Sequence, residues 1–398
     1  MHIESIRLQN FKSFKDTRID DLPNLCALVG ANGTGKTTLL GVFEFLKDCV
    51  TFNVRDALQN LGGFKEVVSR GTETGACIEI EIQFRINIEQ RQAHLNYLVS
   101  IGEENKTPVV FREVLRDSQN QALIYLDYAL GQGRNTATNQ QSVPHGVVGI
   151  QKISMQGTGQ IERDTLALSL FGRFPNYEEV FAIHKAVRGW KLADIDTHAA
   201  RGSKDASGMA DHLLGTGGNL QLVARTLFEN HPAIFQTILH KMRARIPGIS
   251  NITPKLTEDG RLLLQFSDGA FTDPFIDRHV SDGTIKMFAY MVLLHDPQPH
   301  SLLCIEEPEN QLYPSLLAEL AEEFRAWAER GGQVMVSTHS PDFLNAMALD
   351  EVIWLQKVHG YSQFFRARDN QQIAAYMNDG DKMGYLWNEG FFTGAHPQ

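Results

Sequence analysis

The stretch "LVGANGTGKTTLL", residues 28 to 40, joins a glycine-rich turn to a lysine and two threonines. Residues 30 to 37 match the pattern G-x-x-x-x-G-K-[ST] at every fixed position. An apolar run precedes the turn and helical apolar periodicity follows it, which is typical of a strand, a loop and a helix. Glycines let the backbone curl around a phosphate, and the loop N–H groups and the helix start attract anions. The stretch therefore predicts a phosphate-binding loop.

The same pattern gives two side chains a role at a nucleoside triphosphate. Lys36 would reach the β and γ phosphates, and the hydroxyl of Thr37 would ligate Mg²⁺. The alternative is a glycine-rich turn between a strand and a helix that binds nothing. Segments much farther along the chain decide between these two interpretations.

Composition sets the class of protein. The chain has 398 residues, of which 42% are hydrophobic and 21% are charged, so it can form two or three domains with a sizeable core. The first residues alternate and do not form a leader peptide, and no run approaches the roughly 20 apolar residues of a membrane helix. The four cysteines are scattered, which argues against a disulfide framework or a cysteine-based metal site and indicates the reducing cytoplasm. We therefore expect a cytoplasmic protein without a membrane partner.

The net charge of −10 does not favour attraction of the whole molecule to DNA. DNA contact would need a local basic patch. The candidates are Lys241, Arg243 and Arg245 in one segment, and Arg188 with Lys191 in another. Solvated helix faces are the alternative interpretation of these charges.

The remaining chain divides into segments of different pattern. Residues 76–130 hold short segments rich in β-branched and aromatic residues, which predict an antiparallel meander. Residues 131–148 are polar and glycine-containing, and the pattern then becomes helical from residue 164 to about 242. Strands return at 255–266 around an Asp-Gly turn, and from residue 281 helices and strands alternate as in an α/β layer.

The segment "SLLCIEEPENQLYP", residues 301–314, supplies carboxylates at a strand end. An apolar strand ends at Glu306 and Glu307. Beside a phosphate loop, the first carboxylate is placed to hold Mg²⁺ and the second to orient or deprotonate the attacking water. Without the upstream loop, such a pair would usually be an exposed turn.

Two further segments carry residues that could also contact the nucleotide. In "QVMVSTHSPDF", residues 333–343, His339 follows a strand that we expect beside the acidic one, so its imidazole could reach the γ-phosphate or the water. In "HVSDGTIKMFAYMVLL", residues 279–294, the small-residue turn from Ser281 opens an apolar helix. Ser281 could simply cap that helix, or the turn could bind a phosphate held by a second subunit.

The glycine loop, S-D-G-T turn, E-E-P-E strand end and T-H-S strand end occur in an order that resembles the ABC-type ATPase head of SMC, RecF and OLD-family proteins. The "NFKSF" start, the "GGNLQ" turn and the "GYLWNEGFF" tail are also similar to the bacterial AAA-family "predicted ATPase" group. The resemblance implies an α/β P-loop NTPase with a mixed sheet, an antiparallel β-meander and a helical insert. We expect an ATPase core at 1–75 and 255–398, a β subdomain at 76–130 packed on it, and a loop-rich helical insert at 131–254.

The resemblance also implies roles for individual residues. Glu306 matches the family's acidic residue that coordinates Mg²⁺, and Thr37 is the other expected metal ligand. Glu307 matches the catalytic glutamate, and His339 matches the switch histidine. With Lys36, they form the catalytic and metal-binding set. The residues expected to contact the nucleotide are Gly30, Ala31, Asn32, Gly33, Thr34, Gly35, Lys36, Thr37 and Thr38 of the Walker A loop, Ser281 and Gly283 of the signature turn in the partner subunit, and Lys12.

The chain departs from the family pattern at several points. Asp282 replaces a glycine of the signature turn and puts a carboxylate near a polyphosphate, and Tyr313 stands where transporters have the D-loop aspartate. No long coiled coil interrupts the head. Only 59 residues follow His339, too few for the Toprim nuclease domain of OLD proteins, so we expect the chain itself to cut nothing.

These patterns predict an ATPase whose two copies enclose two ATP·Mg²⁺, as a homodimer that could extend into a higher oligomer. Its task is either DNA maintenance, repair or anti-phage defence, or ATP-dependent holding and release of a partner effector such as a toxin or nuclease without action on DNA. Both alternatives stay open, since four motifs specify the ATPase and not its biological task. A transporter subunit is disfavoured, because the large insert and the "NFKSF" opening do not fit one.

Overall fold

The computed structural model describes residues 1–130, 132–133, 162–205 and 208–395. Its centre is a six-stranded sheet in the order β17-β16-β3-β15-β14-β9. Neighbouring strands are parallel except for the antiparallel hairpin of β16 and β17. The strands are β3 (Leu25–Val29), β9 (Trp190–Ala193), β14 (Leu302–Glu306), β15 (Val334–Ser337), β16 (Val352–Val358) and β17 (Tyr361–Arg366). The α/β fold with a mixed sheet that the sequence predicted is confirmed.

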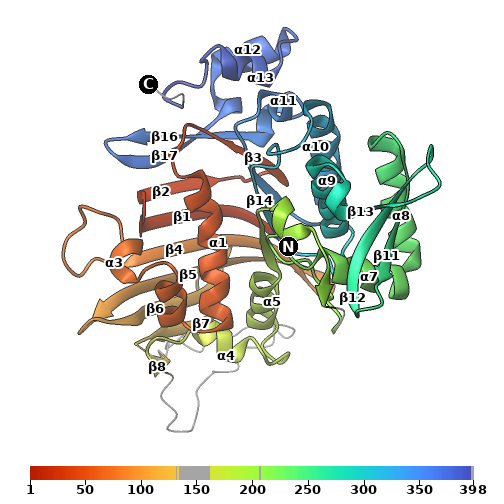
Figure 1. Ribbon diagram of the computed structural model, residues 1–398. Helices are drawn as coiled ribbons and strands as arrows, with labels where there is room; N and C mark the ends of the chain where they lie inside the picture. Colours follow the sequence, from red (N-terminus) through yellow and green to blue (C-terminus); the bar gives the residue numbers. More distant parts are fainter. Residues whose placement is uncertain (131, 134–161, 206–207, 396–398) are drawn as a thin grey trace.

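The central sheet is covered on both faces, which explains its continuous apolar strands. Successive residues of β3 alternate between two cores. Cys26 and Leu28 pack toward α1 (Lys36–Thr51), whereas Leu25, Ala27 and Val29 belong to the core formed with α9 (Asp282–Leu294) and α10 (Pro314–Glu329). Helix α1 therefore lies on one face of the sheet and α9 and α10 lie on the other (Figure 1).

A seven-stranded sheet lies on the far side of α1, in the order β2-β1-β4-β5-β6-β7-β8. Every neighbouring pair is antiparallel, so the meander predicted for residues 76–130 is confirmed and continues the N-terminal hairpin. The strands are β1 (His2–Phe11), β2 (Phe14–Asp20), β4 (Ile78–Ile88), β5 (Arg91–Glu104), β6 (Thr107–Asp117), β7 (Ile124–Ala129) and β8 (Gln132–Gly133). Alternating burial in β4 explains why its sequence alternates.

The chain between residues 162 and 205 returns from the meander to the central sheet. It contains α4 (Ala167–Phe171), α5 (Glu178–Arg188), β9, α6 (Thr197–Ala200) and β10 (Lys204–Asp205). Strand β9 pairs with β14 at the edge of the central sheet, although residues 131–254 were expected to form an insert. The domain boundaries stay a prediction, and the polar segment 131–148 lies almost wholly outside the described residues.

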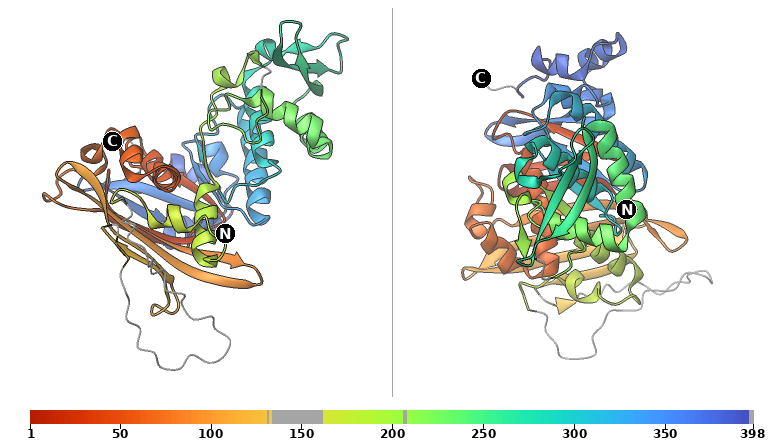
Figure 2. Two further views of the ribbon diagram at one scale, coloured as in Figure 1. Left: turned by 90° about the horizontal axis from the view of Figure 1, so that it is seen from below. Right: turned by 45° about the vertical axis from the view of Figure 1, so that its right-hand side comes forward.

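A separate lobe extends from the sheets (Figure 2). It is built from α7 (Leu220–Asn230), α8 (Pro232–Arg245), β11 (Ile249–Leu256), β12 (Arg261–Asp268) and β13 (Phe275–Ile276). The predicted Asp-Gly turn joins β11 to β12, and Gly260 adopts a φ of 78° there. The remaining described elements are α2 (Val54–Asn60), α3 (Phe64–Val67), α11 (Pro341–Leu344), α12 (Gln371–Asn378), α13 (Met383–Asn388) and the short 3₁₀ turns at Asp277–His279, Leu349–Glu351 and Ala367–Asp369.

Candidate functional site

Three adjacent parallel strands end at one edge of the central sheet. Strand β15 pairs with β3 on one side and with β14 on the other. The glycine loop follows β3, Glu306 ends β14, and His339 lies two residues beyond β15. The carboxyl ends of parallel strands are where open α/β sheets bind ligands. The sequence expectation that the histidine strand lies beside the acidic strand is therefore confirmed.

The glycine loop needs its glycines for space and for backbone conformation. Gly30 has a φ of 151° and Gly35 a φ of 110°. A Cβ atom on Gly30 would lie 2.6 Å from the main-chain oxygen of Leu355, and one on Gly35 would lie 2.6 Å from Oγ of Ser362. Side chains at these positions would displace the loop, so its curvature depends on glycine.

Lys36 lies at the first turn of α1 and its side chain bends back over the loop. Its Nζ atom donates to the main-chain oxygen of Gly30 at 2.7 Å and to that of Ala31 at 3.1 Å. Burial lowers the pKa of the ammonium to about 8, although Glu307 and Glu309 act in the opposite direction. The ammonium thus lies inside the loop, where a phosphate chain would meet it.

Two oxygen ligands for a divalent cation lie together beside the loop. The hydroxyl of Thr37 donates to Oε2 of Glu306 at 3.4 Å. Burial, and then the negative charge of Asp194, raise the pKa of the Glu306 carboxyl, while the Thr37 hydrogen bond lowers it. A hydroxyl and a carboxylate with excess negative charge around them fit Mg²⁺, which prefers hard oxygen ligands. This pair forms across 269 positions of sequence.

Glu307 is fixed by its backbone and by two side chains. Its φ of 39° lies in the left-handed region, and its N–H donates to the main-chain oxygen of Ser337 at 2.9 Å. Its Oε2 atom accepts from Nδ2 of Asn310 at 2.9 Å, and its Oε1 atom lies 3.6 Å from Nε2 of His339. The carboxylate is 42% exposed and can therefore meet a water molecule. The strained backbone holds it at the edge of the site.

Glu309 is a site residue that sequence reasoning missed. Its Oε1 atom accepts from Oγ1 of Thr338 at 2.9 Å and from the backbone N–H of His339 at 2.6 Å. Its Oε2 atom is buried and has no hydrogen-bond partner among the described residues. Burial and then Lys36 lower the pKa of the His339 imidazole, while Glu307 and Glu309 oppose them. Glu309 therefore joins the two strand ends that carry Glu307 and His339.

Lys286 is a second residue that sequence reasoning missed. It lies on α9 with an exposed fraction of only 1%, and its Nζ atom donates to the main-chain oxygen of Glu307 at 3.4 Å. Burial lowers the pKa of its ammonium, while Asp194, Glu309, Glu307 and Asp196 raise it, in that order. A lysine within an otherwise apolar helix is the sequence signal that could have found it.

The turn before α9 caps the helix, as one sequence interpretation held. Oγ of Ser281 accepts from the N–H of Thr284 at 3.3 Å. Asp282 is paired with Arg201, whose Nη2 atom lies 2.5 Å from its Oδ1 atom. A Cβ atom on Gly283 would lie 3.0 Å from the main-chain oxygen of Gln311. Arg201 therefore neutralises the negative charge of Asp282, for which the sequence alone indicated no partner.

Lys12 lies in the turn between β1 and β2 with a φ of 47°. Its N–H donates to the main-chain oxygen of Val67, and the neighbouring Ser13 approaches the loop at Gly35. The fold thus brings this turn beside the phosphate loop. Within the described part of the chain, no side-chain hydrogen bond holds the Lys12 ammonium, so its role at a nucleotide stays a prediction.

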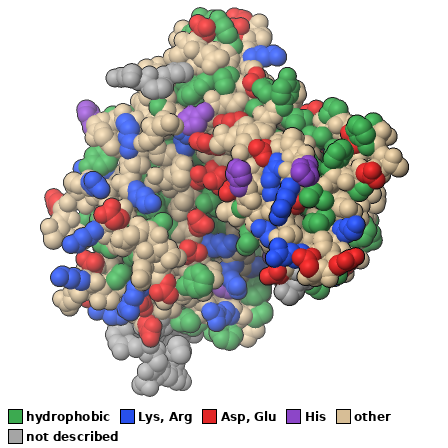
Figure 3. All heavy atoms as spheres, in the orientation of Figure 1, with side chains coloured by type: hydrophobic (Ala, Val, Ile, Leu, Met, Phe, Trp, Pro, Cys, Tyr) green, Lys and Arg blue, Asp and Glu red, His purple; other side chains and the backbone are tan. Residues whose placement is uncertain are grey.

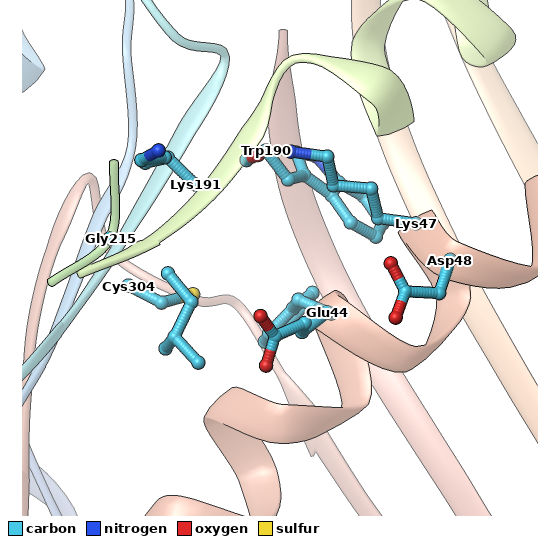
Figure 4. Close-up of a pocket in the computed structure, with 9 residues that line it drawn as sticks. Glu44, Lys47, Asp48, Trp190, Lys191, Gly215 and Cys304 are labelled. Carbon is cyan, nitrogen blue, oxygen red and sulfur yellow. Dashed lines mark hydrogen bonds between the residues drawn. The ribbon is translucent and has the colours of Figure 1, made fainter. Parts of the chain in front are cut away.

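A cavity of about 140 Å³ lies between α1 and β9 (Figure 4). Glu44, Asp48 and Lys47 line it from α1, and Lys191 lies on β9. Nζ of Lys47 donates to the main-chain oxygen of Trp190 at 2.7 Å. This bond ties the phosphate-loop helix to the first residue of β9.

Two family models match the chain in separate parts. Residues 1–142 match the family described as "AAA ATPase domain", and residues 221–345 match "AAA domain, putative AbiEii toxin, Type IV TA system". A crystal structure of the SmcHead bound to the C-winged helix domain of ScpA aligns with a TM-score of 0.54 at 15% identity, over 92% of this chain and 98% of that one. This chain therefore shares the P-loop NTPase fold of SMC ATPase heads, and two parts of it are similar to AAA ATPase domains.

Other comparisons show further similarities to proteins of this kind. An Smc head domain with an extended coiled coil, bound to the C-terminal domain of ScpA derived from Pyrococcus furiosus, aligns with a TM-score of 0.51 at 12% identity and covers 95% of this chain and 99% of that one. A "DNA replication and repair protein RecF" from Heliobacterium modesticaldum is 29% identical over 142 residues, 33% of this chain and 38% of that protein. An "ATP/GTP phosphatase" from Helicobacter pylori is 27% identical over 137 residues, 32% of this chain and 36% of that protein. The head therefore matches less than two fifths of the length of these curated relatives.

Among the described residues, two of the five basic candidates, Lys241 and Arg245, form ion pairs with carboxylates. Lys241 pairs with Glu323, and Nη2 of Arg245 lies 2.5 Å from Oε1 of the same carboxylate. Nε of Arg243 donates to the main-chain oxygen of Ser250 at 2.6 Å. On the face in Figure 3, acidic and basic side chains lie together in and beside the central hollow. The solvated-face interpretation of this segment therefore agrees better with the structure than a dedicated phosphate-backbone patch does.

Proposed function

We propose that this head binds ATP with Mg²⁺, hydrolyses the γ-phosphate, and does so in sites shared by two copies. The observation that carries the proposal is the meeting of Lys36, the Thr37–Glu306 pair and the Glu307–His339 pair at one sheet edge. The likeness to AAA ATPase families and to SMC heads supports it.

Each side chain has a role that follows from its position. Lys36 and the loop N–H groups would bind the β and γ phosphates. Thr37 and Glu306 would hold Mg²⁺, which supplies neutralisation of charge at the phosphate oxygens. Glu307, exposed and oriented by Asn310, would accept a proton from the attacking water or align it. His339, neutral at physiological pH because burial lowers its pKa, can accept or donate a hydrogen bond beside Glu307.

The second half of each site would come from the partner copy. Ser281 is exposed and caps a helix of 13 residues, whose first N–H groups have no acceptor within the helix backbone. In the ATP sandwich, this turn and Gly283 would contact the γ-phosphate bound by the other copy. ATP binding would favour the closed dimer, and hydrolysis would favour the open one, through the difference in their affinities.

Hydrolysis by the purified head, with two variants, tests the chemistry. We expect Lys36→Ala to lose ATP binding and Glu307→Gln to keep binding but lose turnover by about 100-fold or more. Glu329→Gln, an exposed change on α10, serves as the matched control and should hydrolyse ATP at the wild-type rate. Wild-type turnover by Glu307→Gln would remove Glu307 from its assigned role.

The biological task has two candidates. A task in DNA maintenance, repair or defence is supported by the similarity to a protein named for DNA replication and repair. A scaffold that holds and releases a protein effector is supported by the net charge of −10 and by the pairing of Lys241 and Arg245 with Glu323. We infer that the scaffold agrees better with the charges, since phosphate contacts need unpaired cations.

Addition of linear duplex DNA at low salt separates the two tasks. Stimulation of ATP turnover by DNA that is lost in Glu307→Gln would support the DNA task. Turnover indifferent to DNA would support the scaffold. Among the described residues, no helix is long and apolar enough to cross a bilayer, and the cytoplasmic location stays a prediction.

A further inference from the structure

Two histidines and an aspartate meet far from the phosphate loop. His212 lies in the connection before α7, and Asp296 and His300 lie in the connection from α9 to β14. Nδ1 of His212 is 2.7 Å from Oδ2 of Asp296, and Nε2 of His300 is 3.7 Å from the same oxygen. One potential ligand atom from each residue lies within 4.8 Å of the other two.

His300 presents an unpartnered nitrogen to this cluster. Its side chain is only 10% exposed, and its Nε2 atom has no hydrogen-bond partner in the part of the chain that the structure describes. The ring also hydrogen-bonds the backbone of Gly189. Histidine ligands of metals commonly use one ring nitrogen for the metal and donate from the other to a carbonyl group. The buried ring is therefore oriented as a metal ligand is, with its free nitrogen toward Asp296.

The donor set determines the class of ion. Two imidazole nitrogens and one carboxylate are typical ligands of Zn²⁺, with bonds of about 2.0–2.2 Å and ligand atoms therefore about 3.3 Å apart. The distances of 2.7 and 3.7 Å here lie on either side of that spacing. The side chain of His212 is 42% exposed, so water can supply a fourth ligand.

We propose that His212, Asp296 and His300 form a binding site for one zinc-class divalent cation. The ion would join two connections that flank the catalytic elements. One links the helix of Ser281 to the strand of Glu306, and the other accepts hydrogen bonds at Gly215 and Thr216 from the backbones of Asp194 and Asp196. The ion is thus a structural tie behind the ATP site and takes no part in phosphate chemistry.

Lys191 provides a variant that keeps all three ligands. Its ammonium interacts electrostatically with both Asp296 and His300. A positive charge at that position opposes a bound cation, so Lys191→Met should tighten zinc binding several-fold. A cluster held only by internal hydrogen bonds would have no zinc affinity for this change to increase.

The test measures metal content and affinity on the full chain. The protein is stripped with a chelator and then titrated with zinc chloride in excess Mg²⁺, and cobalt chloride reports tetrahedral coordination by its visible absorption. We expect one zinc per chain and a higher melting temperature, both lost in His300→Ala and in Asp296→Asn. His240→Ala, an exposed histidine on α8, and Glu306→Gln should bind zinc as the wild type does.

Two results would overturn the site. One is a wild-type chain that takes up no zinc under these conditions. The other is a His300→Ala/Asp296→Asn chain that binds zinc with the wild-type stoichiometry, which would place the ion elsewhere. If the ligand variants unfold, Lys191→Met decides, because unchanged or weaker zinc affinity in that variant contradicts the proposal.

Discussion

The buried ammonium of Lys286 lies 3.4 Å from the main-chain oxygen of Glu307. It therefore connects α9, which begins at the signature turn, to the backbone of the proposed catalytic glutamate. Asp194 and Asp196 beyond β9 also act on this ammonium, so one cation lies among acidic residues from two strand ends. We infer from this arrangement that Lys286 positions Glu307.

Lys286→Met should lower kcat by about 10- to 100-fold while ATP affinity changes little, because a misplaced Glu307 affects the reaction and not the binding. The variant should be at least as resistant to urea as the wild type, since burial disfavours the ammonium, as its lowered pKa indicates, and Met is an apolar side chain of similar length. Lys185→Met, an exposed change on α5, is the control. Equal losses of kcat and of stability would indicate a purely structural lysine.

ATP affinity should weaken as pH rises above about 8. Burial lowers the pKa of Lys36 to about 8, so the free protein loses this positive charge above that pH. Bound phosphates favour the charged form, so binding must then take up a proton, and the dissociation constant rises by up to about 10-fold per pH unit. Titrations with a fluorescent nucleotide from pH 7 to 9.5 measure how this dissociation constant changes with pH. Lys36→Arg should remove the dependence, and a flat wild-type profile would contradict the assigned environment.

Lys36 also affects the pH dependence of stability. Its folded pKa lies below its unfolded value of 10.5, so the unfolded chain binds more protons between those values. The contribution of this group therefore makes the nucleotide-free protein more stable as pH rises from about 8 toward 10.5. Urea unfolding of the wild type and of Lys36→Met gives the free energy of unfolding at each pH. If this free energy changes with pH equally in both, Lys36 is not the source of the pH dependence.

Glu309→Ala should reduce turnover more than ATP binding. The change removes the acceptor of the Thr338 hydroxyl and of the His339 N–H, so the histidine loses its position beside Glu307. We expect kcat to fall by about 10-fold or more. Glu309→Gln keeps one acceptor oxygen and should retain more activity. A Glu309→Ala enzyme with wild-type kcat would exclude this role.

Arg201→Ala should weaken the ATP-dependent dimer. The arginine pairs with Asp282 at the signature turn, and its loss would leave a carboxylate facing the partner's polyphosphate. Arg201→Ala/Asp282→Ala should recover much of the dimer, because the repulsive charge is removed as well. Sedimentation in the presence of ATP, with Glu307→Gln also present in each chain to prevent hydrolysis, measures dimer formation by the single and the double variant. A double variant no better than Arg201→Ala would place the effect in folding.

The sequence predicted the glycine loop between β3 and α1 and the neighbouring strand ends well, because each has a local pattern. The loop is fixed by four positions in one short stretch, and β3, β14 and β15 are continuous apolar runs. Glu306 and Thr37, although separated by 269 positions, could be paired because parallel strands end at the same edge.

Residues that act through long-range contacts were not predicted. Glu309 appears in sequence as one more acidic residue of a turn, and only the fold places it against His339. The short strand β9 has a mixed sequence, "WKLA", so its pairing with β14 gave no local signal. Arg201 compensates for Asp282 across 81 positions, which no spacing rule captures. Tertiary contacts decide these features.

The central claim is that each ATP site is completed by a second copy. Turnover per chain, measured while the protein is diluted at saturating ATP and Mg²⁺, tests it most directly. The account predicts a steep fall once the concentration passes below the dimer affinity, and Ser281→Arg should lower turnover at every concentration while ATP binding to the monomer persists. Turnover per chain that stays constant down to a concentration at which sedimentation finds only monomers would contradict the shared site.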